Sequence, residues 1–171
     1  MNRAFVKESD GAADEPLPAR RISELPNYVT PAGLERLRAE LGRLTGRRAG
    51  LVARGDDPAA RDELLPVDRD LAYFEARVGS AILVEPAGQP QDEVAFGATV
   101  TVRETVDPAA APAAYRTYTI VGEDEADADT GTVSYASPLA RALLGAHAGQ
   151  TVTWKRPVGD QVLTVERIEY R

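Results

Sequence analysis

Residues 30–44 read TPAGLERLRAELGRL, which combines a helix start with a coiled-coil seam. Threonine is a good N-cap, and proline suits the first helical position, where no backbone N–H is needed. The leucines then recur at intervals of three and four residues, at Leu34, Leu37, Leu41 and Leu44. This spacing is typical of the narrow a/d seam of a coiled coil. The stretch therefore predicts a long helix that begins at Thr30-Pro31 and needs a partner helix.

A second seam of the same kind follows, made of Leu64, Val67, Leu71, Phe74, Val78 and Ala81. The two seams are separated by Arg54-Gly55-Asp56-Asp57-Pro58, which is a typical chain break. Because proline disrupts a helix interior, the second regular helix is predicted to start near Leu65 or Pro66. Residues 27–85 are therefore expected to form an antiparallel coiled-coil hairpin, with a first arm of about 35 Å and a second of about 25 Å.

The hairpin has a tail before it and a linker after it. Residues 1–26 lack hydrophobic periodicity and are rich in proline, so they are expected to form an extended or disordered arm. A functional contact made by Phe5-Val6 is the alternative. Residues 86–90 (PAGQP) are interpreted as a linker. Beyond them the hydrophobic period changes to two, so a separate domain spanning 86–171 is expected.

The period-two segments predict half-buried strands. Their alternating apolar residues are Val100 and Val102, Tyr118 and Ile120, Val133 and Tyr135, Val152 and Trp154, and Leu163 and Val165. Between the third and fourth segments, Ser137-Pro138 and Gly145 bracket one short helix. The expected fold class is α+β, in which the helical hairpin is followed by a strongly bent antiparallel sheet packed on that short helix.

The composition excludes several classes of protein. The 171 residues carry a formal net charge of −7 and contain no cysteine. Without cysteine there are no disulfides, zinc–thiolate sites or thiol nucleophiles, and the cytoplasm is the natural compartment. No apolar run approaches the ~18 residues of a membrane span. An acidic chain is a poor candidate for a dedicated duplex-DNA binder, and nothing in it requires more than a monomer.

The motifs give no support for intrinsic catalysis. His147 has no Ser, Cys or Asp partner in a recognisable order. Neither a GxxxxGK[ST] loop nor a GxGxxG turn occurs. The run 122–127 holds four carboxylates without EF-hand spacing, so a solvated loop and a weak cation site both remain open. The chain is expected to be a binding protein with no cofactor of its own.

Charge is unevenly placed on the hairpin. The first arm is basic, with Arg36, Arg38, Arg43, Arg47, Arg48 and Arg54. The tip is acidic, with Asp56, Asp57, Asp62 and Glu63. Carboxylates on a projecting tip can bind Mg²⁺, and a basic arm can run beside phosphates. The alternative is ordinary solvated charge on a helix surface.

Three blocks of the second domain resemble the C-terminal domain of the Gre family (GreA/GreB) of bacterial transcription elongation factors. They are residues 94–102 (VAFGATVTV), 118–127 (YTIVGEDEAD) and 134–145 (SYASPLARALLG). Residues 28–41 also resemble the start of the Gre coiled coil, and residues 75–84 resemble its end. The resemblance covers about residues 28–171 and is poorest at the hairpin tip.

The resemblance implies an FKBP-like β domain that docks at the rim of the RNA polymerase secondary channel, while the coiled coil enters the channel. In this family two acidic tip residues help to hold Mg²⁺ at the polymerase active site, where a backtracked transcript is cleaved. The implied docking residues are Glu123, Asp124, Glu125, Asp127, Ser137, Pro138 and Arg141. The residues implied to lie near nascent RNA are Arg43, Arg47, Arg48 and Arg54. Mg²⁺ would be shared with the polymerase through Asp56 and Asp57.

The tip departs from the family pattern, which is roughly Gly-Asp-x-x-Glu-Asn-x-Glu-Tyr. Asp56 matches the first acidic residue, whereas the second falls on Ala59. Both arms also look about two turns shorter, or ~10 Å, as in Rnk-type relatives that bind the channel without promoting cleavage. The resemblance thus implies a channel-binding regulator of transcription that is not itself an enzyme. A cleavage factor with rearranged tip carboxylates and an FKBP-like isomerase or chaperone remain the alternatives.

Overall fold

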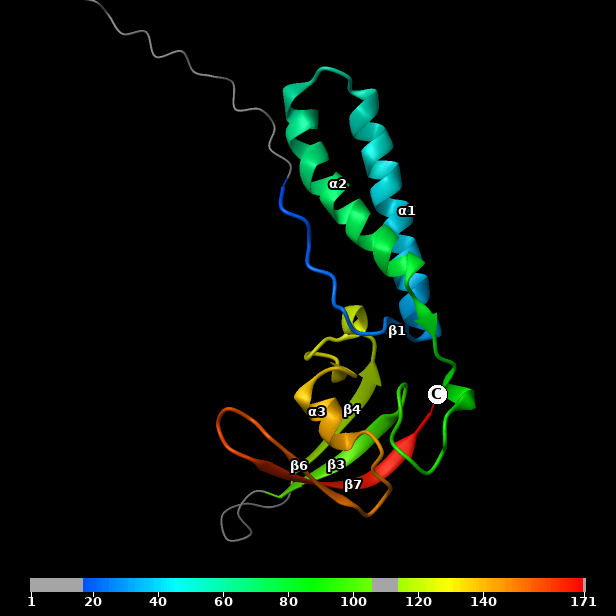
Figure 1. The fold of residues 1–171 in the computed structure, drawn as a ribbon, viewed down its shortest axis with the longest axis vertical. Coiled ribbons are helices and arrows are strands. Elements are labelled where there is room, and N and C mark those ends of the chain that lie inside the picture. Colours follow the sequence, from blue (N-terminus) through cyan, green and yellow to red (C-terminus); the bar gives the residue numbers. More distant parts are fainter. Residues whose placement is uncertain (1–16, 106–113, 171) are drawn as a thin grey trace, which may run out of the picture.

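The computed structural model describes residues 17–105 and 114–170. Figure 1 shows an elongated molecule in which a helical hairpin stands on a small β domain. Each part has a buried apolar cluster of its own. The predicted fold class, a helical hairpin followed by a sheet with one short α-helix, is therefore confirmed, apart from the direction of one strand.

The hairpin consists of α1 (Pro31–Ala53) and α2 (Pro58–Gly79), each about 33–35 Å long. Thr30 caps α1 as predicted, and its hydroxyl accepts a hydrogen bond from the backbone N–H of Gly33. The buried seam residues are Leu37, Leu44, Leu51, Ala60, Val67 and Leu71. The predicted coiled-coil seam is thus confirmed. Among the described residues, no helix combines the length and apolar character needed to cross a membrane.

The predicted start of the second helix near Leu65 or Pro66 is wrong. The helix α2 begins at Pro58, and Pro66 lies inside it. Asp57 caps its first turn, and Ala60 is completely buried in the seam, so these contacts outweigh the hydrogen bond that Pro66 cannot donate. The second arm is therefore as long as the first, rather than about 10 Å shorter.

The root of the hairpin is closed by a small parallel pair of strands, β1 (Tyr28–Val29) and β2 (Ile82–Leu83). The Ile82 N–H donates to the Asn27 carbonyl at 2.8 Å, and the Val84 N–H donates to the Val29 carbonyl at 3.0 Å. This pair was not predicted, because two-residue strands carry no periodic signal. It ties the entry of α1 to the exit of α2.

The β domain is a curled five-stranded sheet with the order β5-β4-β3-β7-β6. Its strands are β3 (Thr99–Thr105), β4 (Ala114–Val121), β5 (Thr132–Ser134), β6 (Thr151–Trp154) and β7 (Gln161–Glu169). The helix α3 (Pro138–Leu143) buries Leu139, Ala140 and Leu143 against it. The linker contains a 3-10 turn, η1 (Pro86–Gly88), and a second turn, η2 (Glu123–Glu125), follows β4. All five predicted strand segments and the short helix are present.

The prediction of a wholly antiparallel sheet is wrong at one edge. The strand β5 runs parallel to β4, with Ile120 paired to Val133. Between them the chain reverses twice, first through η2 and then through a tight antiparallel bridge between Asp127 and Thr132. Two reversals return the chain to its original direction. The segment that makes them also carries the acidic run and projects toward the hairpin.

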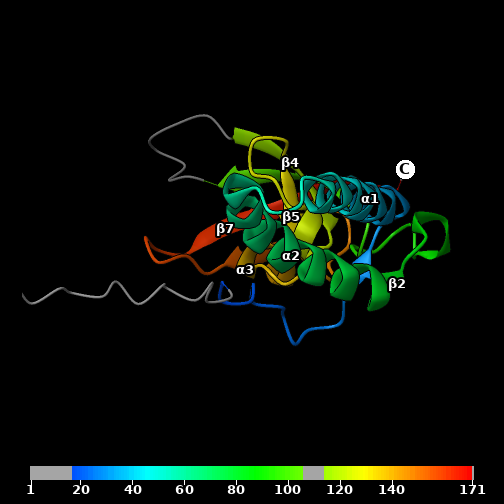
Figure 2. The same ribbon diagram turned by 90° about the horizontal axis from the view of Figure 1, so that it is seen from above.

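The arm before the hairpin is described from residue 17 onward, where it forms no helix or strand before β1. It runs beside α2 toward β1, which can be followed in both ribbon views (Figures 1 and 2). Leu17 and Ala19 face Leu65, Asp68 and Ala72 of α2 across a small cavity. The suggested contact site Phe5-Val6 lies outside the described residues.

Candidate functional site

The acidic run at 122–127 makes the contact between the β domain and the hairpin. Asp124 accepts one hydrogen bond on each carboxylate oxygen, from the Tyr73 hydroxyl at 2.5 Å and from Arg77 Nε at 2.5 Å. The Arg77 side chain is only 2% exposed, and its Nη2 also lies 3.6 Å from Glu123 Oε2. The loop thus holds the C-terminal half of α2 by charge-assisted bonds.

Glu125 holds the other helix of the hairpin. Its side chain is 2% exposed and accepts hydrogen bonds from the Thr30 backbone N–H at 2.9 Å and from the Thr30 hydroxyl. The Gly122 backbone N–H, at 3.3 Å, is a third donor, and Arg36 lies 3.6 Å away. A carboxylate in this place neutralises the positive end of the α1 dipole. Glu123, Asp124 and Glu125, expected at a docking surface, are therefore engaged within the molecule.

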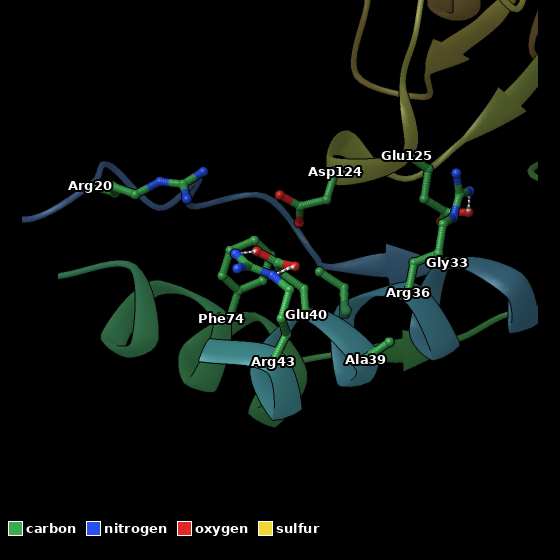
Figure 3. Close-up of a pocket in the computed structure, with 10 residues that line it drawn as sticks. Arg20, Gly33, Arg36, Ala39, Glu40, Arg43, Phe74, Asp124 and Glu125 are labelled. Carbon is green, nitrogen blue, oxygen red and sulfur yellow. Dashed lines mark hydrogen bonds and ion pairs between the residues drawn. The ribbon is translucent and has the colours of Figure 1, made fainter. Parts of the chain in front are cut away.

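Gly33 allows this contact to form. A Cβ at position 33 would lie 2.0 Å from the carboxyl carbon of Glu125, closer than any real contact. Figure 3 shows Glu125 reaching down onto the first turn of α1 at this glycine. Glycine otherwise costs a helix about 1 kcal/mol relative to alanine, so its presence here has a steric reason.

At the opposite end of the hairpin, arginines pair with the tip carboxylates. Arg61 Nη2 lies 2.6 Å from Asp56 Oδ1, and Arg54 Nη2 lies 2.5 Å from Asp57 Oδ2. Asp57 also caps α2 by accepting the Ala59 N–H at 3.0 Å. The hydrogen bond from Arg54, followed by that from Ala59, holds the pKa of Asp57 below its usual value. Asp57 is therefore already used on both of its oxygens.

The remaining tip acids differ from each other. Glu63 lies 3.2 Å from Arg47 and 3.8 Å from Arg54, so it too is paired with the first arm. Asp62 is exposed, and no ion pair to it is seen within residues 17–105 and 114–170. No group of three or more His, Cys, Asp or Glu side chains in the described part of the chain could hold a metal ion.

Comparison with known proteins identifies the family. Residues 89–170 match the family described as "Transcription elongation factor, GreA/GreB, C-term". The transcription elongation factor GreA of Ralstonia nicotianae is 34% identical over 157 residues, which cover 83% of this chain and 96% of that protein. The chain belongs to the GreA/GreB family of transcription elongation factors. Since 157 aligned residues exceed the length of 89–170, the likeness to GreA extends beyond the β domain.

Further members of the Gre family match over most of the chain. GreB of Neisseria meningitidis is 29% identical over 163 residues, covering 86% of this chain and 96% of that protein. Among solved structures, GreA factor homolog 1 (Gfh1) of Thermus thermophilus is 23% identical and covers 85% of this chain and 99% of its own, with a TM-score of 0.39.

The four basic residues predicted to lie near RNA in this Gre protein are all paired with acids. Arg48 Nε lies 2.6 Å from Asp68 of α2, and Arg43 makes two hydrogen bonds to Glu40, at 2.8 and 2.6 Å. Arg47 and Arg54 pair with tip carboxylates as described above. These exposed pairs contribute little to stability. The predicted proximity to RNA stays a prediction.

The other predicted docking residues lie on the exposed side of the β domain. Ser137 caps α3 by accepting the Ala140 N–H at 3.1 Å, and Pro138 and Arg141 are exposed on that helix. Asp127 is exposed and accepts the Asp129 N–H at 2.9 Å in a local turn. These four residues remain candidates for docking, whereas the Glu125 carboxylate has no surface to offer a partner.

The aromatic residues of the β domain meet the hairpin root. Phe96 and Tyr135 both pack on Tyr28 of β1, with ring centroids 6.0 and 5.4 Å from it. An isomerase site requires an open pocket lined by aromatic rings. Here the Phe96 and Tyr135 rings also lie 6.0 Å from each other, so the three rings pack together at the hairpin root.

Sequence reasoning missed the hairpin side of this contact, namely Thr30, Tyr73 and Arg77. Thr30 was recognised only as a helix cap. Arg77 lies between the seam residues Phe74 and Val78, and an arginine at the edge of an apolar seam, followed later by an acidic run, was a usable signal. The missing information was which acids the fold would bring to it.

Proposed function

We propose that this Gre-family protein binds RNA polymerase at the secondary channel and regulates transcription by occupying the channel with its hairpin, without stimulating transcript cleavage. The observation that carries the proposal is that both carboxylate oxygens of Asp57 are engaged at the tip, one by Arg54 and the other by the Ala59 N–H that caps α2. The resemblance to Gre factors implies that transcript cleavage needs two tip acids that are free to hold Mg²⁺. Asp57 would have to give up both Arg54 and the cap of α2 to do so.

The reach of the hairpin supports the same proposal. Each helix is about 33–35 Å long. If the arms are about two turns shorter than those of cleavage factors, the tip stops ~10 Å short of the catalytic metal. Direct ligation of a metal tolerates deviations of only about 0.2 Å. The hairpin can then fill the channel but not complete the metal site.

The β domain is proposed as the polymerase-binding part. Its candidates are the exposed Asp127, Pro138 and Arg141 and the half-buried Ser137. The acidic run that contains Asp127 orients the hairpin. The exposed arginines of α1 lie along the side of the hairpin, where they can approach phosphates of the transcript. The protein itself supplies no catalytic group in this proposal.

A true cleavage factor is the second candidate, and one observation favours it. The Asp56 side chain is 98% exposed, so its bond to Arg61 is screened by water and easily broken. Asp62 is exposed as well and could turn to the same side. Neither residue caps α2, so both could be freed without uncapping it.

A competition assay tests the proposal. Backtracked elongation complexes are treated with a cleavage-competent GreA, and this protein is added in rising amounts. We expect GreA-dependent cleavage to fall as the channel becomes occupied. The charge reversal Arg141→Glu is expected to weaken competition, while Arg21→Glu on the arm serves as a matched control. Undiminished cleavage at saturating protein would overturn channel occupancy.

A further inference from the structure

The arm before the hairpin is attached to the middle of α2 by the side chain of Arg20. The Arg20 guanidinium carbon lies 3.7 Å from the centre of the Tyr73 ring and 5.4 Å from that of Phe74. Its Nη1 also lies 3.5 Å from Asp70 Oδ1. A guanidinium stacked on an aromatic face and paired with a carboxylate is held by two independent attractions. Arg21, the next residue, is exposed and makes no such contact within the described part of the chain.

The ring on which Arg20 stacks belongs to the contact between the hairpin and the β domain. The Tyr73 hydroxyl donates to Asp124 at 2.5 Å, and Arg77 donates to the other oxygen of the same carboxylate. Burial, assisted by Asp124, raises the pKa of Tyr73 to about 12, so the phenol stays a donor at neutral pH. One face of Tyr73 thus meets the arm, and its hydroxyl meets the β domain.

The far end of the arm is attached to both parts. The Pro26 carbonyl accepts a hydrogen bond from the Tyr135 hydroxyl at 2.5 Å. The buried Asn27 side-chain amide donates to the Arg77 carbonyl at 2.7 Å and to the Ser80 hydroxyl at 3.2 Å. The segment 20–27 therefore spans the contact and is fixed on either side of it.

An open pocket lies next to Arg20 at the same contact. A cavity of about 530 Å³ lies between the arm, α1, Phe74 and the acidic loop, with Arg20 on one wall and Asp124 and Glu125 on another (Figure 3). On this side the hairpin is held to the β domain by the hydrogen bonds of Asp124 and Glu125. The arm adds a further restraint through Arg20, which contacts the same Tyr73 side chain that Asp124 binds.

We propose that Arg20 is a positioning residue, which holds Tyr73 against Asp124 and so fixes the angle between the hairpin and the β domain. The consequence for transcription rests on the proposed function, since the angle decides where the tip stands once the β domain has docked. The restraint itself is a property of the free protein. It can therefore be tested without polymerase.

The test is a distance measurement between the two parts by pulsed electron paramagnetic resonance. The chain has no cysteine, so Val52→Cys near the tip and Val158→Cys in the β domain give two unique spin-label sites, both exposed. Arg20→Ala is compared with Arg21→Ala, which removes the same charge from the same arm. We expect one narrow distance distribution in the parent and in Arg21→Ala. In Arg20→Ala, the ratio of molecules in the narrow distance peak to molecules at other distances should fall about two- to fivefold.

Two further variants keep the test decisive. Arg20→Lys retains the positive charge but not the planar stack. If Arg20→Ala fails to fold, the distance distribution of Arg20→Lys is used in its place. Tyr73→Phe keeps the stacked ring and loses only the bond to Asp124, so it should broaden the distribution too. A narrow distribution in Arg20→Lys and Arg20→Ala, or a broad one in the parent, would overturn the positioning role. Either result is independent of polymerase binding, which is measured separately with the same variants.

Discussion

The carboxylate of Glu125 fills the space that a side chain at position 33 would need. The two residues come from different parts of the molecule, and the contact is made possible by a glycine in the first turn of α1. Glu125 also accepts hydrogen bonds from both the backbone N–H and the hydroxyl of Thr30. The start of the hairpin and the acidic run of the β domain are therefore complementary in shape and in hydrogen bonding.

Gly33→Ala should displace Glu125 and destabilise the protein by about 2–3 kcal/mol, because the new methyl group meets the carboxylate and the buried hydrogen bonds are lost. Gly42→Ala in the same helix is the matched control, since nothing lies within 4 Å of its added Cβ. That variant should gain up to about 1 kcal/mol from helix propensity. Urea unfolding of both variants measures the difference, and equal effects would contradict the contact.

Arg77→Gln should lower the free energy of unfolding by about 3–5 kcal/mol, because it leaves Asp124 with an unbalanced charge in a largely buried place. Adding Asp124→Asn should recover part of the loss, so the double variant is less destabilised than the sum of the two single variants. Chemical denaturation of the four proteins of this cycle provides the measurement. Simple additivity would show that the two side chains do not interact.

Pro66→Ala should stabilise the hairpin by about 1–3 kcal/mol, because alanine restores the backbone donor that Pro66 lacks inside α2. Pro58→Ala is the control, since proline at the first helical position lacks no needed bond and the change should stay within about 0.5 kcal/mol. Thermal unfolding distinguishes the two. A loss of stability in Pro66→Ala would mean that a bend at this proline is required for packing.

Asp57 should make the hairpin sensitive to acid. Its pKa is lowered in the folded protein, mainly by the hydrogen bond from Arg54. The ionised carboxylate therefore stabilises the fold at pH values above its ordinary pKa of 3.8. This contribution is lost as the pH falls through the lowered pKa. Asp57→Asn keeps a cap acceptor but does not titrate, so its stability should fall less steeply over that range. Denaturation midpoints from neutral to acidic pH provide the comparison, and identical slopes would contradict the pairing.

Local signals in the sequence were sufficient for most of the elements. Thr30-Pro31 and Ser137-Pro138 mark helix starts, and the leucine seam and period-two strands need only neighbouring residues to be recognised. Pro66 misled because its penalty is local, whereas the buried Ala60 that outweighs it depends on the partner helix. The parallel pairing of β5 depends on how many times the short loop before it reverses direction. The hydrophobic pattern of the sequence does not contain that information.

The contact between the two parts could not be predicted for a related reason. Glu125 meets Thr30 across 95 positions, and Asp124 meets Arg77 across 47. Hydrogen bonds at such separations leave no periodic trace in a single sequence. The acidic run was recognised as important, but its role was assigned to an external partner.

Transcript cleavage in backtracked elongation complexes, with rising Mg²⁺ and a parallel measurement of polymerase binding, is the most direct test. Because Arg54 and the cap of α2 engage both oxygens of Asp57, we expect binding without stimulated cleavage at any Mg²⁺ concentration. Cleavage that grows with Mg²⁺ and disappears in the Asp56→Ala, Asp57→Ala double variant, while binding is kept, would contradict this. The tip carboxylates would then reach the catalytic metal despite their arginine partners.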